Sequence, residues 1–274
     1  MALYAFLIPT TNARSAIILI GLASAFASST LVLSTPNLSL SPNAPLQGPR
    51  LKVIQFNLKP GKDDDTAIVT WLSKERPDLL VLQDLKAPLM HRLSDSMGDM
   101  TFNCTLDCEV AVGVRRPIAE KVAVGRGGYG LTPATLIARL DVDGVPATLV
   151  ATHLARPTFG GKASLTRNVQ VQAANLSRLE GLLNDLPRDR MVVVGDFNAT
   201  PWSWAGRRVQ GFLGLERRTS ATPTWPTLPW GGALLPIDHV YAGANWKTVE
   251  MRRGPSLGSD HYPVVVTLEM ASPY

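Results

Sequence analysis

Polar side chains suited to chemistry follow a short apolar run beyond the middle of the chain. Met191 to Val194 are rich in β-branched residues and too few for a helix, so they predict a buried strand bounded by Gly195. Asp196 and Asn198 come next, and strand alternation points both side chains into one cleft. Taken alone, an Asp-x-Asn sequence is more often an Asx turn that satisfies nearby backbone, so further residues must decide.

Similar polar groups recur where other expected strands begin or end. They are Asn57 after residues 51–56, Asp84 after 79–82, His153 after 147–152, Asp238 within 237–241, and Asp260 with His261 before 263–268. Each group is weak evidence when taken singly, because a lone histidine after a strand is usually structural. Their recurrence in one chain indicates a site built from strand ends.

Two helices are expected to support these strands. Apolar residues at helical spacing mark one helix over 164–186, which Pro187 closes. Asp63 to Asp65 precede a second helical pattern, and acidic residues there fit a helix N-terminus better than a cation site.

Turn residues indicate how other segments connect. Asp143 and Gly144 predict a hairpin between strands at 134–139 and 147–152. The stretch 199–236, rich in tryptophan and proline, predicts a long irregular loop.

The composition is typical of a globular domain with room for a substantial core: 274 residues, 45% apolar and 18% charged. The formal charge is +5 and the pI is near 9.4. Arginine pairs account for many cations, and their forked groups match phosphate geometry, so an anionic substrate is allowed. A solvated basic surface explains them equally well. Cys104 and Cys108 predict a small local disulfide in an exported protein.

The N-terminal part predicts export. Residues 16–33 carry no charge over 18 positions; Arg14 precedes this segment, and the next cation is Arg50. This asymmetry places the N-terminus in the cytoplasm and the later residues on the extracytoplasmic side, as a membrane-anchored protein. Small-x-small sequences also fit a cleavable signal peptide, which would give a secreted protein. We expect three parts: a hydrophobic anchor or signal at 1–33, a Pro/Ser-rich tether at 34–50 and a folded domain at 51–274.

Six segments carry the polar residues described above: IQFNL, LLVLQD, ATHL, VVVGDFNATP, IDHVY and GSDHYPV. In this order they resemble the endonuclease/exonuclease/phosphatase superfamily, which includes DNase I-like nucleases, inositol-phosphate phosphatases and bacterial sphingomyelinases. The resemblance covers about Leu51 to Glu269. Together with the N-terminal segment, GDFNATPWS, PTWP and IDHV look like its membrane-anchored bacterial branch.

The resemblance implies an α/β fold: a four-layer α/β sandwich of two mixed β-sheets packed face to face and flanked by helices. One N-terminal hydrophobic helix is expected to precede it. The implied catalytic domain is a metal-dependent phosphoric ester hydrolase that attacks a phosphodiester or phosphomonoester in line with water.

Asn57, Asp84 and Asp260 are the metal ligands that the resemblance implies, for Mg²⁺ with Mn²⁺ as an alternative. The family usually has glutamate where this chain has Asp84, so LQE is replaced by LQD. The shorter arm draws the carboxylate back by roughly 1.3–1.5 Å. The replacement of glutamate by Asp84 is therefore expected to affect metal affinity and, through it, activity.

The resemblance also implies catalytic roles. Asp196 is expected to orient or deprotonate the attacking water, and His261, held by Asp238, is expected to donate to the phosphoryl oxygen. The residues expected to bind the substrate phosphate are Asn198, His153 and Arg167. His91 and His239 are expected to be structural.

The implied partners are a phosphate-ester substrate and, through the N-terminal segment, a membrane; no obligate protein partner is implied. Nucleic acid, a phospholipid head group and a small phosphoester all stay open as substrates. The alternative function is a membrane-anchored binding module of the same fold with weak or no catalysis.

Overall fold

The computed structural model describes residues 48–58, 64–125, 130–157 and 162–271. The predicted hydrophobic segment and most of the predicted tether lie outside these residues, so both stay predictions. In the part of the chain that is described, no helix combines the length and apolar character needed to cross a membrane.

The strands of the described part form two six-stranded mixed sheets. One sheet has the order β11-β12-β1-β2-β4-β3, and the other has the order β5-β6-β7-β8-β10-β9. The pairs β1–β2 and β7–β8 are parallel, and the other neighbours are antiparallel. The strand bounds are β1 (Arg50–Asn57), β2 (Leu79–Gln83), β3 (Thr101–Cys104), β4 (Val110–Val114), β5 (Ile118–Val124), β6 (Ala134–Val142), β7 (Val145–His153), β8 (Met191–Asp196), β9 (Glu216–Arg217), β10 (Asp238–Ala242), β11 (Trp246–Arg253) and β12 (Val264–Met270).

Alternation gives each sheet an inner and an outer face. On β1, Val53 belongs to the core between the sheets, whereas Ile54 belongs to the core on the outer face. On β8, Val194 faces the same central core and Val193 faces the opposite helices. Every second residue of a central strand therefore points between the two sheets, which fixes where any polar residue at a strand end must point.

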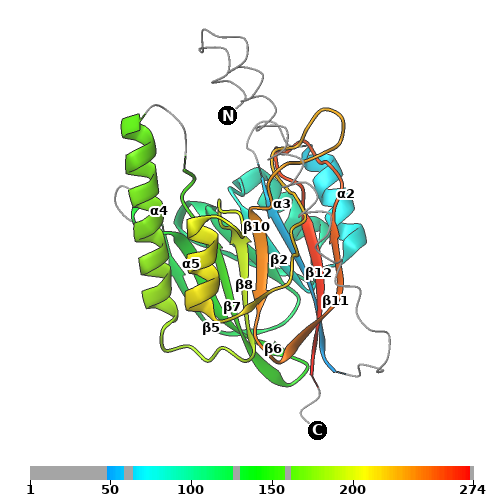
Figure 1. The fold of residues 1–274 in the computed structure, drawn as a ribbon. Helices are drawn as coiled ribbons and strands as arrows, with labels where there is room; N and C mark the ends of the chain where they lie inside the picture. The colour runs from blue at the N-terminus through cyan, green and yellow to red at the C-terminus, as the bar shows by residue number, and fades with distance from the viewer. Residues whose placement is uncertain (1–47, 59–63, 126–129, 158–161, 272–274) are drawn as a thin grey trace. The chain divides into compact units, whose positions relative to one another are not determined.

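Four helices cover the outer faces in the described part: α2 (Asp65–Glu75), α3 (Ala87–Ser96), α4 (Lys162–Leu183) and α5 (Trp204–Leu213). Figure 1 shows α2 and α3 on one side of the sheets and α4 and α5 on the other. Ile68 and Leu89 pack on the first sheet, while Leu176 and Val209 pack on the second. These layers confirm the predicted four-layer α/β sandwich.

Local predictions were confirmed where a single residue type decides the backbone. Asp64 caps α2, because its Oδ1 accepts from the backbone N–H of Ala67 at 3.0 Å. Asp143 and Gly144 both have positive φ, 53° and 84°, as a tight hairpin turn requires. The disulfide predicted between Cys104 and Cys108 is present.

The prediction of a long irregular loop over 199–236 is wrong in its first part, which contains α5. Ser203 caps this helix by accepting from the N–H of Gly206 at 3.1 Å, and Gly214 ends it with a φ of 62°. Val209 is fully buried against the sheet. Glycines within the segment lower its helix propensity and hide this pattern in the sequence.

Candidate active site

The candidate site lies at one edge of the two sheets, where polar residues replace the apolar residues of the inner faces. Strands β1, β2, β7 and β8 end there, and β10 begins there, so their polar terminal residues meet at one edge. A cavity of about 330 Å³ opens at this edge. Its lining residues are Asn57, Leu58, Asp84, His153, Leu154, Arg156, Asp196, Asn198, Asp260 and His261.

Asp196 lies at the centre of the site and is held from both sides. Nδ2 of Asn57, on the other sheet, donates to Oδ2 of Asp196 at 2.8 Å. The backbone N–H of Asn198 donates to Oδ1 at 2.7 Å, which is the Asx turn considered in the sequence. The Asx turn is thus part of the candidate site and not an alternative to it. Asn198, the last residue of this turn, has a φ of 47°.

Gly195 lets β8 reach this position. A Cβ on this residue would collide with the backbone carbonyl of Thr152 on the parallel neighbour β7. Because only glycine allows this approach, Asp196 is brought level with His153, its partner in the strand register.

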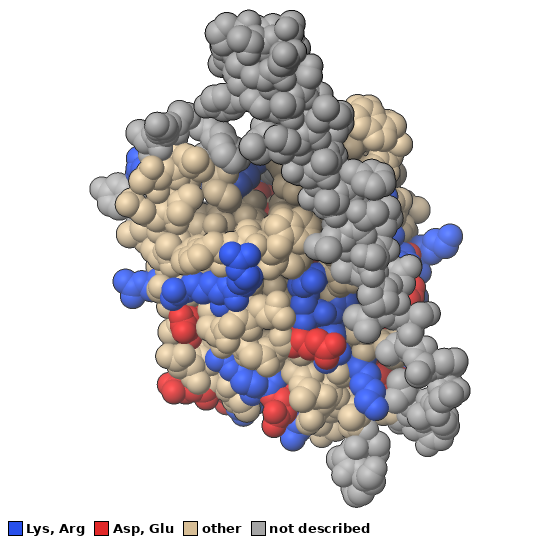
Figure 2. Space-filling model, in the orientation of Figure 1, with Lys and Arg blue, Asp and Glu red and all other residues tan. Residues whose placement is uncertain are grey.

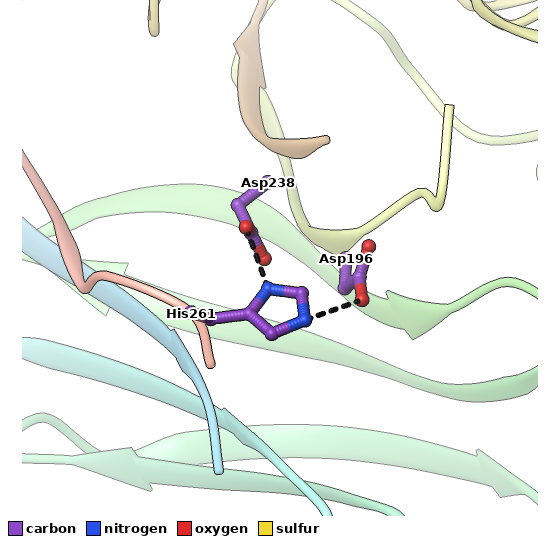
Figure 3. Close-up of side chains that lie close together, drawn as sticks. All are labelled: Asp196, Asp238 and His261. Carbon is purple, nitrogen blue, oxygen red and sulfur yellow. Dashed lines mark hydrogen bonds and ion pairs between the residues drawn. The ribbon is translucent and has the colours of Figure 1, made fainter. Parts of the chain in front are cut away.

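His261 and Asp238 form a buried pair (Figure 3). Nδ1 of His261 donates to Oδ2 of Asp238 at 2.9 Å, and its Nε2 lies 3.9 Å from Oδ2 of Asp196. Burial opposes the charged imidazolium, but Asp238, Asp196 and Asp260 outweigh it and raise the pKa of His261 to about 9. The imidazole is therefore positively charged at neutral pH.

The pKa values of two neighbouring buried carboxylates are shifted in opposite directions. Asp196 and Asp238 face each other in the antiparallel register of β8 and β10. Burial and the negative charge of Asp238 raise the pKa of Asp196 above its usual range. Burial also acts on Asp238, but the charge and hydrogen bond of His261 outweigh it and lower its pKa. Asp196 is consequently the stronger base of the two.

His153 reaches the cavity between two carboxylates. Its Nε2 lies 3.7 Å from Oδ2 of Asp196, and its Nδ1 lies 3.3 Å from Oε1 of Glu109. Burial disfavours the charged ring, but Glu109, Asp196 and Asp84 together raise the pKa of His153. His153 is thus suited to donate a hydrogen bond to an anion.

Glu109 is a site residue that sequence reasoning missed. It precedes β4, and the backbone N–H of Asp84 donates to its carbonyl at 3.0 Å. The register of β2 and β4 pairs Gln83 with Val110, so Glu109 is the next residue opposite Asp84. This strand pairing is the signal that could have identified Glu109 as a site residue, and it becomes visible only once the strand order is known.

The residues predicted to hold a metal line one side of the cavity. Asp84 has a φ of 56°, a conformation that aspartate tolerates, and it turns the chain at the end of β2. Oδ2 of Asp260 accepts from the indole N–H of Trp225 at 3.2 Å. Asn57 directs its amide nitrogen to Asp196, a bond that does not use its acceptor oxygen. Two carboxylates and an amide oxygen suit a hard divalent cation.

A second group of possible metal ligands is more tightly paired with itself. In the described part of the chain, Asp196, Asp238 and His261 place ligand atoms within 4.8 Å of one another. The Nδ1 proton of His261 is already donated to Asp238, and Oδ2 of Asp196 already accepts from Asn57. The group therefore fits a proton-handling role better than direct coordination of magnesium, which prefers oxygen ligands.

Two arginines and one further histidine are also placed by the structure. Arg167 lies exposed on α4 and does not line the cavity, whereas Arg156, which sequence reasoning did not single out, does. His239 is buried, with Nε2 at 2.9 Å from the carbonyl oxygen of Ala199, which agrees with the structural role expected of it.

The fold is that of a DNase I-like α/β sandwich. The chain belongs to the Endonuclease/Exonuclease/phosphatase family, whose sequence model matches residues 54–261. No curated protein matches it.

Similar solved structures share this fold. Humanized TDP2 from D. rerio has a TM-score of 0.63 and 18% identity, over 81% of this chain and 99% of its own. A family protein from Beutenbergia cavernae has a TM-score of 0.62 and 21% identity, over 82% and 72%. Sphingomyelinase C from Streptomyces griseocarneus has a TM-score of 0.59 and 17% identity, over 82% and 100%.

Proposed function

We propose that this protein is a divalent-metal-dependent phosphoesterase that hydrolyses a phosphodiester or phosphomonoester by in-line attack of water. One observation carries the proposal. A single cavity joins a buried carboxylate of raised pKa, Asp196, to the charged imidazole of His261 and to the oxygen ligands Asp84 and Asp260.

Asn57, Asp84 and Asp260 would hold Mg²⁺, with Mn²⁺ as the alternative. When bound, the cation neutralises phosphate oxygens that would otherwise repel a nucleophile. Asp84 is the residue on which this fit depends most, because its arm is one methylene shorter than the glutamate usual in the family.

The chain's own residues handle the proton and the phosphate. Asp196 orients the attacking water and accepts its proton, helped by its raised pKa. His261, positively charged and fixed by Asp238, donates to a phosphoryl oxygen from Nε2. The groups that bind the phosphate are His153, Asn198 and Arg156 within the cavity, with Arg167 reserved for a substrate that extends beyond it.

We propose three substrate classes: nucleic acid, phospholipid head groups and small phosphoesters. D. rerio TDP2, which shares the fold, has been seen with a single strand DNA product, and another structure with this fold is a sphingomyelinase C. On the face shown in Figure 2, Lys and Arg lie interspersed with Asp and Glu, so the charge of this face does not select among them.

We also propose that the protein belongs to the membrane-anchored bacterial branch of the family and acts on the extracytoplasmic side, attached by residues 16–33 or secreted after cleavage. The support is the uncharged run, with Arg14 before it and no Lys or Arg between Arg14 and Arg50. A C-terminal alkaline phosphatase fusion should be active, whereas a fusion that is fluorescent only in the cytoplasm would overturn the orientation.

The test of the activity is a substrate panel with magnesium: bis-p-nitrophenyl phosphate, plasmid DNA, sphingomyelin and inositol phosphates. We expect hydrolysis of at least one substrate, loss of that activity in EDTA and its return on adding magnesium. Binding of a phosphoester without turnover, in magnesium and in manganese, would instead establish the alternative, a catalytically inactive binding module. The shortened arm of Asp84 is the observation that favours this alternative.

A further inference from the structure

Two buried glutamines behind the cavity are used by none of the roles above. Gln55 on β1 and Gln83 at the end of β2 are both fully shielded from solvent, yet each occupies an inner-face position between the sheets. Nε2 of Gln55 donates to Oε1 of Gln83 at 2.9 Å and to Oδ1 of Asp238 at 2.8 Å. Side chains without polar atoms would fill these positions at lower cost, since buried polar groups require partners.

We propose that Gln55 and Gln83 are positioning residues that fix the Asp238 carboxylate and, through it, the imidazole of His261. The inference rests on the proposed phosphoesterase function. It concerns a connected chain of four side chains, Gln83, Gln55, Asp238 and His261, in which each contact is 2.8–2.9 Å long.

Gln55 fixes the rotation of the carboxylate. Asp238, on β10, uses Oδ2 for His261 and Oδ1 for Gln55, so its two oxygens are held by two separate partners from the side of the opposite sheet. A carboxylate held at both oxygens cannot turn about its terminal bond, and the direction of the Nδ1 bond of His261 is thereby set. Nε2 of His261 then points toward Asp196, as Figure 3 shows.

Gln83 fixes the orientation of the Gln55 amide. An amide can face Asp238 with its nitrogen or with its oxygen, and only the nitrogen can donate. Because Oε1 of Gln83 accepts the second N–H of Gln55, it favours the orientation that directs the nitrogen to the carboxylate. An amide also keeps its donors at every pH, so it holds Asp238 without competing for the proton on His261.

Asn57 makes the same kind of contact two residues further along β1. Its Nδ2 donates to Asp196, which faces Asp238 in the strand register. Residues 55 and 57 share one face of the strand, so β1 presents two amide donors to the two buried carboxylates of the opposite sheet. The two contacts match the spacing of residues 55 and 57 on β1 to the spacing of the two carboxylates. Of the two amide residues, Gln55 is the one that lies behind the cavity.

The test compares Gln55→Met, which keeps the shape but removes the donor, with Gln55→Glu, which keeps the shape and, when ionised, places a second negative charge beside Asp238. The full chain is used in detergent. We expect kcat to fall about tenfold in Gln55→Met and further in Gln55→Glu, with KM and the magnesium concentration at half-maximal rate within about twofold of wild type. Gln83→Met should lower kcat by a smaller factor, about threefold.

A second readout does not depend on activity. The proton on Nδ1 of His261, assigned by its loss in His261→Gln, should move upfield in the NMR spectrum of Gln55→Met and less so in Gln83→Met. Thr135→Val is the matched control, because it removes a buried hydroxyl that bonds Thr152 at 3.0 Å, away from Asp238. It should lower the melting temperature while leaving kcat and the resonance unchanged.

An unmoved resonance with kcat within twofold of wild type in Gln55→Met would overturn the proposal, and so would an equal loss of kcat in Thr135→Val. If Gln55→Met does not fold, the same two readouts on Gln83→Met decide. If no substrate is hydrolysed, the proposed function fails, but the resonance still tests the positioning role separately.

Discussion

Asp84 is the residue whose chemistry bears most on metal binding. Its carboxylate is set back by about one methylene, and magnesium requires ligand oxygens near ~2.1 Å, so we expect half-maximal activity only at high magnesium and a higher rate with manganese. Asp84→Glu should lower the magnesium concentration at half-maximal rate, and Asp84→Ala should abolish most metal-dependent activity. Magnesium titrations of the three proteins with one substrate measure both effects.

The outcomes of these titrations are distinct. Equal half-saturation and rate in wild type and Asp84→Ala would move the metal to other carboxylates, Asp196 and Asp260 first. If Asp84→Glu needs more magnesium or turns over more slowly than wild type, the site is already adapted to the shorter arm of aspartate. Asp84 would then still be a metal ligand, but the weak magnesium binding expected of it would be wrong.

His239 links burial to stability at acidic pH. Burial and the nearby Arg217 charge lower its pKa to about 4, whereas the unfolded chain binds this proton near pH 6.5. The stabilising contribution of the neutral ring is therefore complete above pH 6.5 and is lost as pH falls toward 4, by about 3 kcal/mol in all. His239→Gln should flatten the pH dependence of the free energy of unfolding in that window. Urea unfolding from pH 4 to 7 checks this, and identical slopes in both proteins would contradict it.

For single residues, the sequence identifies those whose side-chain type is required by the chemistry of the site. Asp196, Asp238 and His261 were predictable because each adjoins a strand and belongs to a recognisable motif, and the structure brings them together. Glu109 and Arg156 were not, since their roles depend on which strands are neighbours. Gln55 lies inside one of the quoted motifs, but its contact crosses between sheets, which no local pattern reveals.

Among the elements, the segments between Asn198 and the start of β10 carry exposed tryptophans. Trp202 and Trp204 precede or begin α5 and are 46% and 50% exposed, and Trp230, between β9 and β10, is 79% exposed. The loop holding Trp230 is attached to the site, because the N–H of Thr227 donates to the carbonyl of Asp260 at 2.9 Å. These side chains are thus available to stack with bases or to enter a lipid surface.

We therefore expect Trp230→Ala to raise KM for the natural extended substrate severalfold without changing hydrolysis of bis-p-nitrophenyl phosphate. The melting temperature should stay constant, since the side chain is mostly exposed. Val122→Ala, at a 57% exposed position on β5, is the matched control. An equal change in KM for the small and the extended substrate would show that the tryptophan acts on the chemistry instead of on substrate contact.

Elements were predictable where burial makes a pattern. The central strands and the helix later found as α4 have long apolar patterns, and the hairpin at Asp143 has a decisive turn residue. The edge strand β5 is largely exposed and the edge strand β3 is only partly buried, so neither shows a buried face in sequence. α5 was missed because glycines interrupt a short apolar pattern.

For the whole molecule, the four-layer architecture followed from family resemblance and not from periodicity. Strand order depends on contacts between distant segments, such as β1 with β12, which local patterns cannot encode. That order is what turns scattered polar residues into a site. Parallel central strands end at the same edge, and their inner faces are already directed toward each other.

The measurement that tests the central claim most directly is the turnover of the best substrate in magnesium by wild type, Asp196→Asn and His261→Ala. Asp196→Asn keeps the shape and the acceptor for the Asn198 N–H but removes the base, and the Asn57 amide must turn its oxygen toward the new amide nitrogen. We expect each variant to lose at least ~10²-fold in kcat. His261→Ala should also lower the melting temperature, because it leaves the buried Asp238 carboxylate without its positive partner, so turnover is compared under conditions in which each variant is folded. Folded variants with near-normal turnover would contradict the assignment of this cavity as the catalytic site.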